Sequence, residues 1–187
     1  MNRQYLLFTL IGLLSAVGGG LFYQSFNSSP EIYSVEKMDL DRVNSLPSIH
    51  FDDIALNDLT GQSRHLQEWD SPLLMVNFWA PWCAPCRREI PALKELQTSF
   101  SDQLQIIGLS FDSQQRVSAF NQQHNINYPL LLVQHEASMV NRYFGNGSGA
   151  LPFTALLNPQ RQIIYKHHGE ITREELEKQI KTALEVH

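Results

Sequence analysis

The order of apolar and polar residues from Ser48 to His187 predicts strands and helices in alternation. Apolar positions between Phe51 and Leu59, with a turn-like Asp58-Leu59-Thr60-Gly61, indicate an opening strand or hairpin. Largely apolar runs at Leu73–Trp79 and Leu104–Phe111 are typical of strands that are buried on both faces. We therefore expect an α/β domain with a central sheet.

Four helices are predicted, three of them from apolar residues that recur every three or four positions. The first begins near Cys83, the second spans residues 114–124, and a short third one spans Glu136 to Phe144. The fourth has the clearest start, because Thr172 and Glu175 form a capping box. The residues expected to face inward on the first, second and fourth helices are Ile90, Leu93, Leu96, Val117, Phe120, Leu176, Ile180 and Leu184.

A strand pair is predicted between the third and fourth helices. The segment GNGSG at residues 145–149 is expected to be flexible, and PFTALLN at residues 152–158 follows it. QIIYKHH at residues 162–168 returns after a turn at Pro159-Gln160-Arg161. The two strands should therefore run antiparallel.

A different pattern precedes this domain. The nineteen residues from Tyr5 to Tyr23 carry no charge, and as a helix they would be about 28 Å long, close to the ~30 Å of a bilayer core. Arg3 precedes them and Glu31 is the first charge after them, which places the N-terminus in the cytoplasm. We expect an uncleaved transmembrane anchor at residues 1–23, with a cleaved signal peptide as the alternative.

Residues 24–47 are polar and show no sustained periodicity, so they are interpreted as a linker from the membrane to a domain at residues 48–187. The chain has 187 residues, which suits one globular domain with an appendage. Its formal net charge of -5 argues against a phosphate-binding surface, so we expect no nucleic-acid partner. Whether residues 1–23 are an anchor or a signal peptide, the domain is expected to be exported.

Candidate chemistry gathers in NFWAPWCAPCRRE, residues 77–89, which holds both cysteines of the chain, Cys83 and Cys86. A zinc site would need two further ligands, and the adjacent His167 and His168 would point to opposite faces of a regular strand. A structural disulfide would close a loop too short to restrict the unfolded chain much. The third possibility, reversible cycling between dithiol and disulfide, makes use of the position of the pair.

That position is the junction between a strand and a helix. Unpaired backbone amides and the helix dipole stabilise a thiolate there, and can lower a cysteine pKa from about 8.5 to ~3.5 to 7.5. Cys83 is therefore predicted to be the nucleophile. Cys86, one helical turn further on, should be more covered and should act as the resolving thiol.

FWAPWCAPC after an apolar strand resembles the thioredoxin superfamily, and WCAPCRREIPAL is similar to its membrane-anchored TlpA/ResA-like thiol-disulfide oxidoreductases. The resemblance extends over Ser48 to His187 and includes the LTGQ turn, the GLSFD strand and Leu151-Pro152. It implies a thioredoxin-like fold, with a central mixed sheet flanked by helices, an N-terminal hairpin and a central insertion. One N-terminal transmembrane helix would precede this fold.

The resemblance also implies roles for residues near the cysteines. Pro152 matches the cis-proline of the superfamily, which leaves the backbone of the preceding residue, Leu151, free to bond an extended substrate. Trp82 resembles the tryptophan that shields the disulfide and offers a flat surface to partners. Pro85, within Ala84-Pro85, resembles the reducing members.

Glu89 matches the acidic residue that this branch places near its cysteines, where it could relay the proton of Cys86. The alternative is an ordinary solvated glutamate near a helix start. Asn77 stands where thioredoxin has a buried aspartate, which raises the importance of Glu89. Arg87 and Arg88 are expected either to be solvated or to lower the thiol pKa.

The resemblance implies a reductase of disulfides in partner proteins, with no cofactor beyond the Cys83–Cys86 couple and no metal. It implies a transmembrane thiol reductase of the DsbD or CcdA kind as electron donor, and apocytochrome c or the copper-site thiols of an oxidase as clients. The expected location is the bacterial cytoplasmic membrane, with the C-terminal domain in the periplasm or extracytoplasmic space. The alternatives are a disulfide oxidase or isomerase, a peroxidase, and a non-catalytic metal-binding module.

Overall fold

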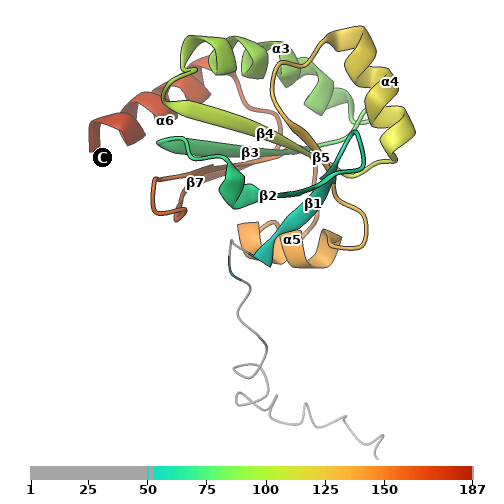
Figure 1. Cartoon of the computed structure of the whole chain (residues 1–187). Coiled ribbons are helices and arrows are strands. Elements are labelled where there is room, and N and C mark those ends of the chain that lie inside the picture. The colour runs from blue at the N-terminus through green and yellow to red at the C-terminus, as the bar shows by residue number, and fades with distance from the viewer. Residues whose placement is uncertain (1–49, 51–52, 187) are drawn as a thin grey trace, which may run out of the picture. The chain divides into compact units, whose positions relative to one another are not determined.

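The structure is a computed structural model that describes residue 50 and residues 53–186 (Figure 1). Its strands are β1 (Ala55–Asp58), β2 (Ser63–His65), β3 (Leu73–Trp79), β4 (Leu104–Ser110), β5 (Leu130–Leu132), β6 (Phe153–Leu157) and β7 (Ile163–His168). Its helices are the short 3-10 helix η2 (Leu66–Glu68) and the α-helices α3 (Ala84–Ser99), α4 (Gln114–His124), α5 (Ala137–Phe144) and α6 (Arg173–Val186).

The strands of the described residues form one mixed sheet in the order β2-β1-β5-β4-β3-β6-β7. β3 lies inside this sheet, parallel to β4 and antiparallel to β6. The predicted N-terminal hairpin is present as β1 and β2, and β5 joins it to the rest by pairing antiparallel to β1 and parallel to β4. The thioredoxin-like architecture with a central mixed sheet is confirmed.

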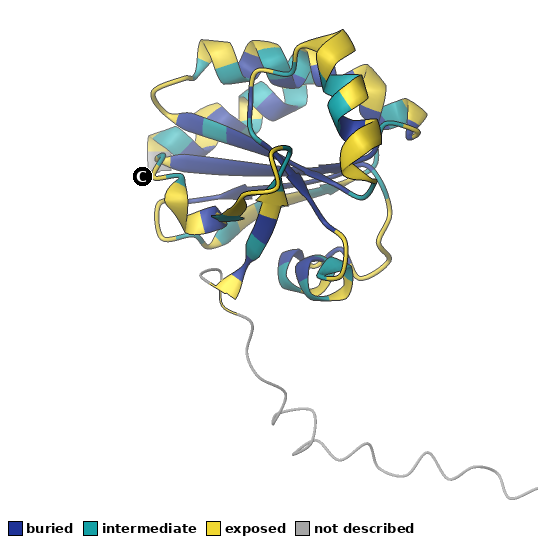
Figure 2. Cartoon of the chain, turned by 45° about the vertical axis from the view of Figure 1, so that its right-hand side comes forward, coloured by how far each residue is buried: buried dark blue, intermediate teal, exposed yellow. Residues whose placement is uncertain are grey.

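The core has two layers, one on each side of the sheet. Alternate residues of a strand point to opposite faces, so Leu73, Met75 and Trp79 contact one cluster while Leu74, Val76 and Phe78 contact the other. Helices α3, α4 and α6 contribute to the first cluster and α5 to the second. Figure 1 shows these helices on opposite sides of the sheet, and Figure 2 shows that its central strands are buried.

The predicted helices are present, and their apolar stripes face the sheet. Ile90, Leu93 and Leu96 are buried on α3, and Leu176 and Ile180 on α6. On α4, Val117 is buried and Phe120 packs beside it against the first cluster. At the start of α6 the Glu175 amide donates to the Thr172 hydroxyl at 3.3 Å, which is one of the two bonds of the predicted capping box, whereas the Glu175 carboxylate accepts from Gln179 Nε2.

The strand β5 was not predicted. It is only three residues long, and its partners β1 and β4 are brought to it by the fold. The predicted anchor at residues 1–23 and the linker at residues 24–47 lie outside the described residues. Within the part of the chain that is described, no helix combines the length and the apolar character needed to cross a bilayer.

Candidate active site

Cys83 and Cys86 form a disulfide at the start of α3, with an S–S distance of 2.02 Å and a Cα–Cα distance of 5.3 Å. Cys83 is the N-cap residue, and the Cys86 amide donates a hydrogen bond to its sulfur at 3.3 Å. Pro85 lies in the first turn, where a helix has no use for the missing amide donor. The strand-to-helix junction predicted for the pair is confirmed.

The two cysteine residues differ in burial. Cys83 retains 5% of its surface and Cys86 retains none. The open amides at the N-terminus of the sixteen-residue α3 point toward Cys83 and favour negative charge on its sulfur. Cys83 is therefore the more accessible of the two cysteines and has the helix N-terminus beside it, which is the setting that the predicted nucleophile requires.

Glu89, one turn further along α3, is buried with 2% of its surface exposed. Its Oε1 accepts a hydrogen bond from Asn77 Nδ2 at 2.8 Å, and its Oε2 accepts one from the Ile171 amide at 3.4 Å. Burial raises the pKa of Glu89 to about 7, and the two hydrogen bonds only partly oppose this effect. The alternative of an ordinary solvated glutamate is thus wrong, and the role of Glu89 as a proton relay stays a prediction.

Asn77 connects the Glu89 carboxyl group to Thr154 through hydrogen bonds. Asn77 lies on β3 and also donates from Nδ2 to the Thr154 hydroxyl at 3.2 Å, while its Oδ1 has no hydrogen-bond partner in the structure. Tyr128 is buried nearby, and burial, with a smaller contribution from the Glu89 carboxylate, raises its pKa. The group around Glu89 is therefore polar but shielded from water, which suits a carboxyl that exchanges a proton near neutral pH.

An ion pair lies outside this group. Arg88 Nε donates to both carboxylate oxygens of Glu170, at 2.9 and 3.0 Å, next to the Ile171 amide that bonds Glu89. Both side chains are well exposed, so water screens the pair and it contributes little to stability. Arg88 is therefore a solvated residue with a partner on the loop before α6, and Arg87 is exposed.

The residues predicted to bind a substrate, Trp82, Leu151 and Pro152, differ in their exposure, and Pro152 is buried. Trp82 is 63% exposed directly before Cys83. The Leu151-Pro152 bond is cis, as the resemblance implied. Leu151 is half-buried against both core clusters, one of which contains Cys83 and Cys86.

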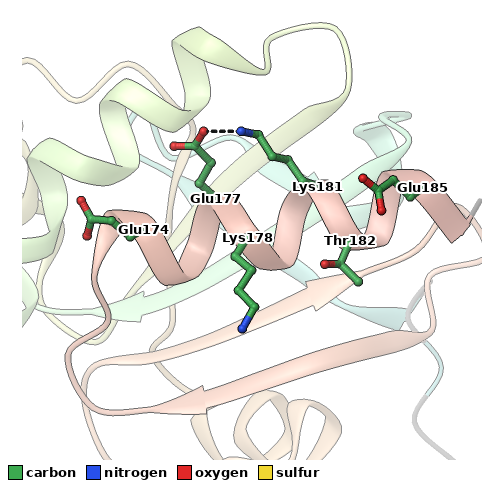
Figure 3. Close-up of a pocket in the computed structure, with 6 residues that line it drawn as sticks. All are labelled: Glu174, Glu177, Lys178, Lys181, Thr182 and Glu185. Carbon is green, nitrogen blue, oxygen red and sulfur yellow. Dashed lines mark ion pairs between the residues drawn. The ribbon is translucent and has the colours of Figure 1, made fainter.

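No other site competes for the chemistry among the described residues. They contain no group of three or more His, Cys, Asp or Glu side chains arranged to hold a metal ion. His167 and His168 lie on opposite faces, with His167 beside Tyr165 and His168 against Phe153. A hollow on the outer face of α6 is lined by that helix alone and includes none of the residues around the cysteines (Figure 3).

The sequence profile of the AhpC/TSA family matches residues 48–166, more than half of the chain. The chain belongs to the AhpC/TSA family. Among curated relatives, the thioredoxin-like protein YneN of Bacillus subtilis is 27% identical over 184 residues, which cover 96% of this chain and 98% of YneN. The thiol-disulfide oxidoreductase ResA of Bacillus cereus is 28% identical over 185 residues, covering 97% of this chain and 98% of ResA.

A solved structure agrees with these relatives. The thioredoxin-related protein from Neisseria meningitidis serogroup B superposes with a TM-score of 0.64 at 26% identity, covering 70% of this chain and 98% of that protein. Together with the closed cysteine pair, the comparisons make this AhpC/TSA family member a thioredoxin-like thiol-disulfide oxidoreductase of the ResA type.

Three groups at the site were not predicted: Thr154, Tyr128 and the backbone amide of Ile171. Thr154 is the polar residue within the apolar run that follows Pro152, and this position was a signal that it has a role. Nothing in the sequence marks a backbone amide 82 residues away from its acceptor as part of the site. Such a contact exists only because the loop before α6 packs on α3.

Proposed function

We propose that this protein reduces disulfide bonds in partner proteins outside the cytoplasm, held at the membrane by residues 1–23. The observation that carries the proposal is the unequal burial of the two cysteine residues at the start of α3, since only Cys83 of the pair retains exposed surface. Trp82 and the Leu151-Pro152 segment would receive the partner polypeptide around that sulfur.

The reduced form starts the reaction. The Cys83 thiolate attacks one sulfur of a partner disulfide, the partner's S–S bond breaks, and its second sulfur leaves as a thiolate that takes up a proton. Cys83 is then joined to the partner by a mixed disulfide. No net electron transfer has yet been completed, because one disulfide has been exchanged for another.

Resolution completes the transfer. The Glu89 carboxylate takes the proton of Cys86, directly or through water, and the resulting thiolate attacks Cys83 and expels the partner sulfur. Two electrons have then passed from the enzyme dithiol to the partner, and the enzyme is left with the Cys83–Cys86 disulfide. A carboxyl group whose pKa is about 7 suits this step, because it exchanges protons readily at neutral pH.

The electrons must be replaced from another molecule, because the chain has no third cysteine. The donor proposed is a transmembrane thiol reductase that carries electrons across the membrane. Proteins whose cysteines must be reduced before they take up haem or copper are the proposed clients. The Ala84-Pro85 pair between the cysteines, which resembles that of the reducing members of the superfamily, supports the reducing direction.

Trapping in the native host tests the assignment of the two sulfurs. Cys86→Ser should accumulate mixed disulfides with client proteins, because the intermediate on Cys83 cannot be resolved, and Cys83→Ser should accumulate none. Mass spectrometry of the trapped species identifies the clients. Accumulation with Cys83→Ser instead would reverse the assigned roles.

A redox titration tests the direction separately. A midpoint close to ~-270 mV, as in thioredoxin, supports a reductase, whereas a midpoint near ~-120 mV, as in DsbA, would mean that the protein is an oxidant.

A further inference from the structure

Asn146 is a fully buried polar residue in the segment of residues 145–149 that was predicted to be flexible. Its exposed fraction is 0%, although its neighbours Gly145 and Gly147 are exposed. A buried amide is costly unless its polar atoms find partners. The position of Asn146 therefore needs an explanation beyond that of an ordinary turn residue.

The partners of Asn146 lie on both sides of the segment. Its Nδ2 donates to Asn141 Oδ1 at 2.9 Å and to the Ala150 carbonyl at 3.0 Å. Its backbone amide donates to the Asn141 carbonyl, and its own carbonyl accepts from the Gly149 amide, each at 2.8 Å. The segment is thus a closed turn tied to α5, and this differs from the flexible linker that its composition predicts.

The turn is built on a fixed support. Val140 and Phe144 of α5 are fully buried beneath the sheet, so the end of this helix is held in place. Gly145 and Gly149 have φ angles of 78° and 64°, which only glycine adopts readily, and they let the chain close around Asn146. The support for the turn therefore comes from the face of the sheet opposite to α3.

The other end of the turn leads to the surface proposed to receive substrate. The Ala150 carbonyl bonded by Asn146 belongs to the peptide unit that joins Ala150 to Leu151, and Leu151 packs against the cluster that contains Cys83 and Cys86. An apolar side chain could fill the space of Asn146, but it could not donate to Asn141 and to Ala150 at once. The side chain is thus matched to holding this peptide unit in one place.

We propose that Asn146 is a positioning residue for substrate binding, which fixes the Ala150-Leu151 backbone where a partner polypeptide lies against the disulfide. This inference rests on the proposed function, because it takes polypeptides to be the substrates. Asn146 itself touches neither the sulfurs nor Glu89 by any hydrogen bond of the structure. It should therefore affect the recognition of a polypeptide and leave the reactivity of Cys83 unchanged.

Two substrates of different size separate these effects. The full chain, purified in mild detergent and reduced beforehand, is mixed with insulin or with the small disulfide 5,5′-dithiobis(2-nitrobenzoate), and the second-order rate constant is measured for each. For Asn146→Ala we expect the constant for insulin to fall roughly tenfold, the equivalent of one lost hydrogen bond of about 1.4 kcal/mol. The constant for the small disulfide should stay within about twofold, because it needs only Cys83.

Asn158→Ala is the matched control. Asn158 is also a buried turn asparagine, it follows the opposite end of β6, and its side chain bonds Gln162. Its loss should leave the ratio of the two constants unchanged. An equal fall of both constants in Asn146→Ala, or an equal change of the ratio in Asn158→Ala, would overturn the inference, because a general loss of structure would then explain the result.

A milder pair of variants covers the case in which Asn146→Ala does not fold. Asn141 is half-buried and offers Oδ1 to Asn146, so Asn141→Ala should lower the insulin constant while Asn141→Asp, which keeps that oxygen, should restore it. Equal constants for these two variants would overturn the inference. If the wild-type chain reduces the small disulfide but not insulin or any trapped client, the proposed function fails and this inference fails with it.

Discussion

The burial of Glu89 makes a quantitative prediction about stability and pH. The pKa of this carboxyl group is raised from 4.5 to about 7 by burial, while in the unfolded chain it returns to the lower value. Below pH 4.5 the group is protonated in both the folded and the unfolded chain, so it does not lower the free energy of unfolding. As the pH rises from 4.5 to about 7, only the unfolded chain releases its proton, so stability is lost until the group in the folded chain also ionises.

The size of the loss follows from the two values. The difference between 4.5 and about 7, at 1.36 kcal/mol per pKa unit, corresponds to roughly 3 kcal/mol. This is a large share of the roughly 5–15 kcal/mol that stabilise a typical domain. Glu89→Gln keeps the shape and removes the ionisation, so the variant should gain about this much relative to the wild type between pH 4.5 and pH 8.

Urea unfolding of the oxidised protein across this pH range measures the effect. The quantity to compare is the free energy of unfolding of the variant minus that of the wild type, since other titrating groups cancel in this difference. Glu185→Gln is the control, because Glu185 is an exposed glutamate on α6. A difference that stays constant from pH 4.5 to pH 8 would refute the reasoning, since it would mean that Glu89 titrates alike in the folded and unfolded chains.

Two further predictions concern the neighbours of this site. Asn77→Asp places a second carboxyl group against Glu89, and because two carboxylates in contact cannot both ionise easily, the pair should keep a proton to higher pH. The raised pKa of the folded pair predicts that stability is intact at low pH and is lost more steeply above pH 7 than in the wild type. The same urea series would disprove this if the stability curves of the variant and the wild type ran parallel. Gly108→Ala adds a methyl group that would meet Leu130 Cδ2 at 2.7 Å and Trp79 Nε1 at 3.0 Å, so we expect the free energy of unfolding to fall by about 1–3 kcal/mol. An unchanged midpoint of urea unfolding would contradict this, because it would show that the neighbouring side chains can move aside at little cost.

Local patterns were sufficient to predict most of the architecture. β3 was predicted with its observed bounds, because a run of seven residues in which only Asn77 is polar allows a strand but leaves no polar face for a surface helix. α6 was predicted for a similar reason, since its capping threonine and its apolar stripe are both local signals. These elements depend on residues that are neighbours in the sequence.

The contacts that sequence analysis could not supply are distant ones. Glu89 owes its burial to the loop before α6, and the Ile171 amide that bonds it is 82 residues away. β5 is too short to be distinguished from a buried loop until β1 and β4 are placed beside it. The composition of residues 145–149 predicts a flexible segment, and it gives no sign that Asn146 is buried and bonded at both ends of a turn.

The division of the sheet into two faces separates two kinds of adaptation. Asn77 is hydrogen-bonded to Glu89 of α3, and Cys86 belongs to the cluster on the α3 side, whereas α5, which supports the turn around Asn146, packs on the other side. Side chains on one face of a strand can change without a direct clash on the other. If the turn around Asn146 positions the substrate backbone as proposed, exchange of the segment from α5 to Leu151 should change which clients are reduced, while Cys83, Cys86 and Glu89 stay in place.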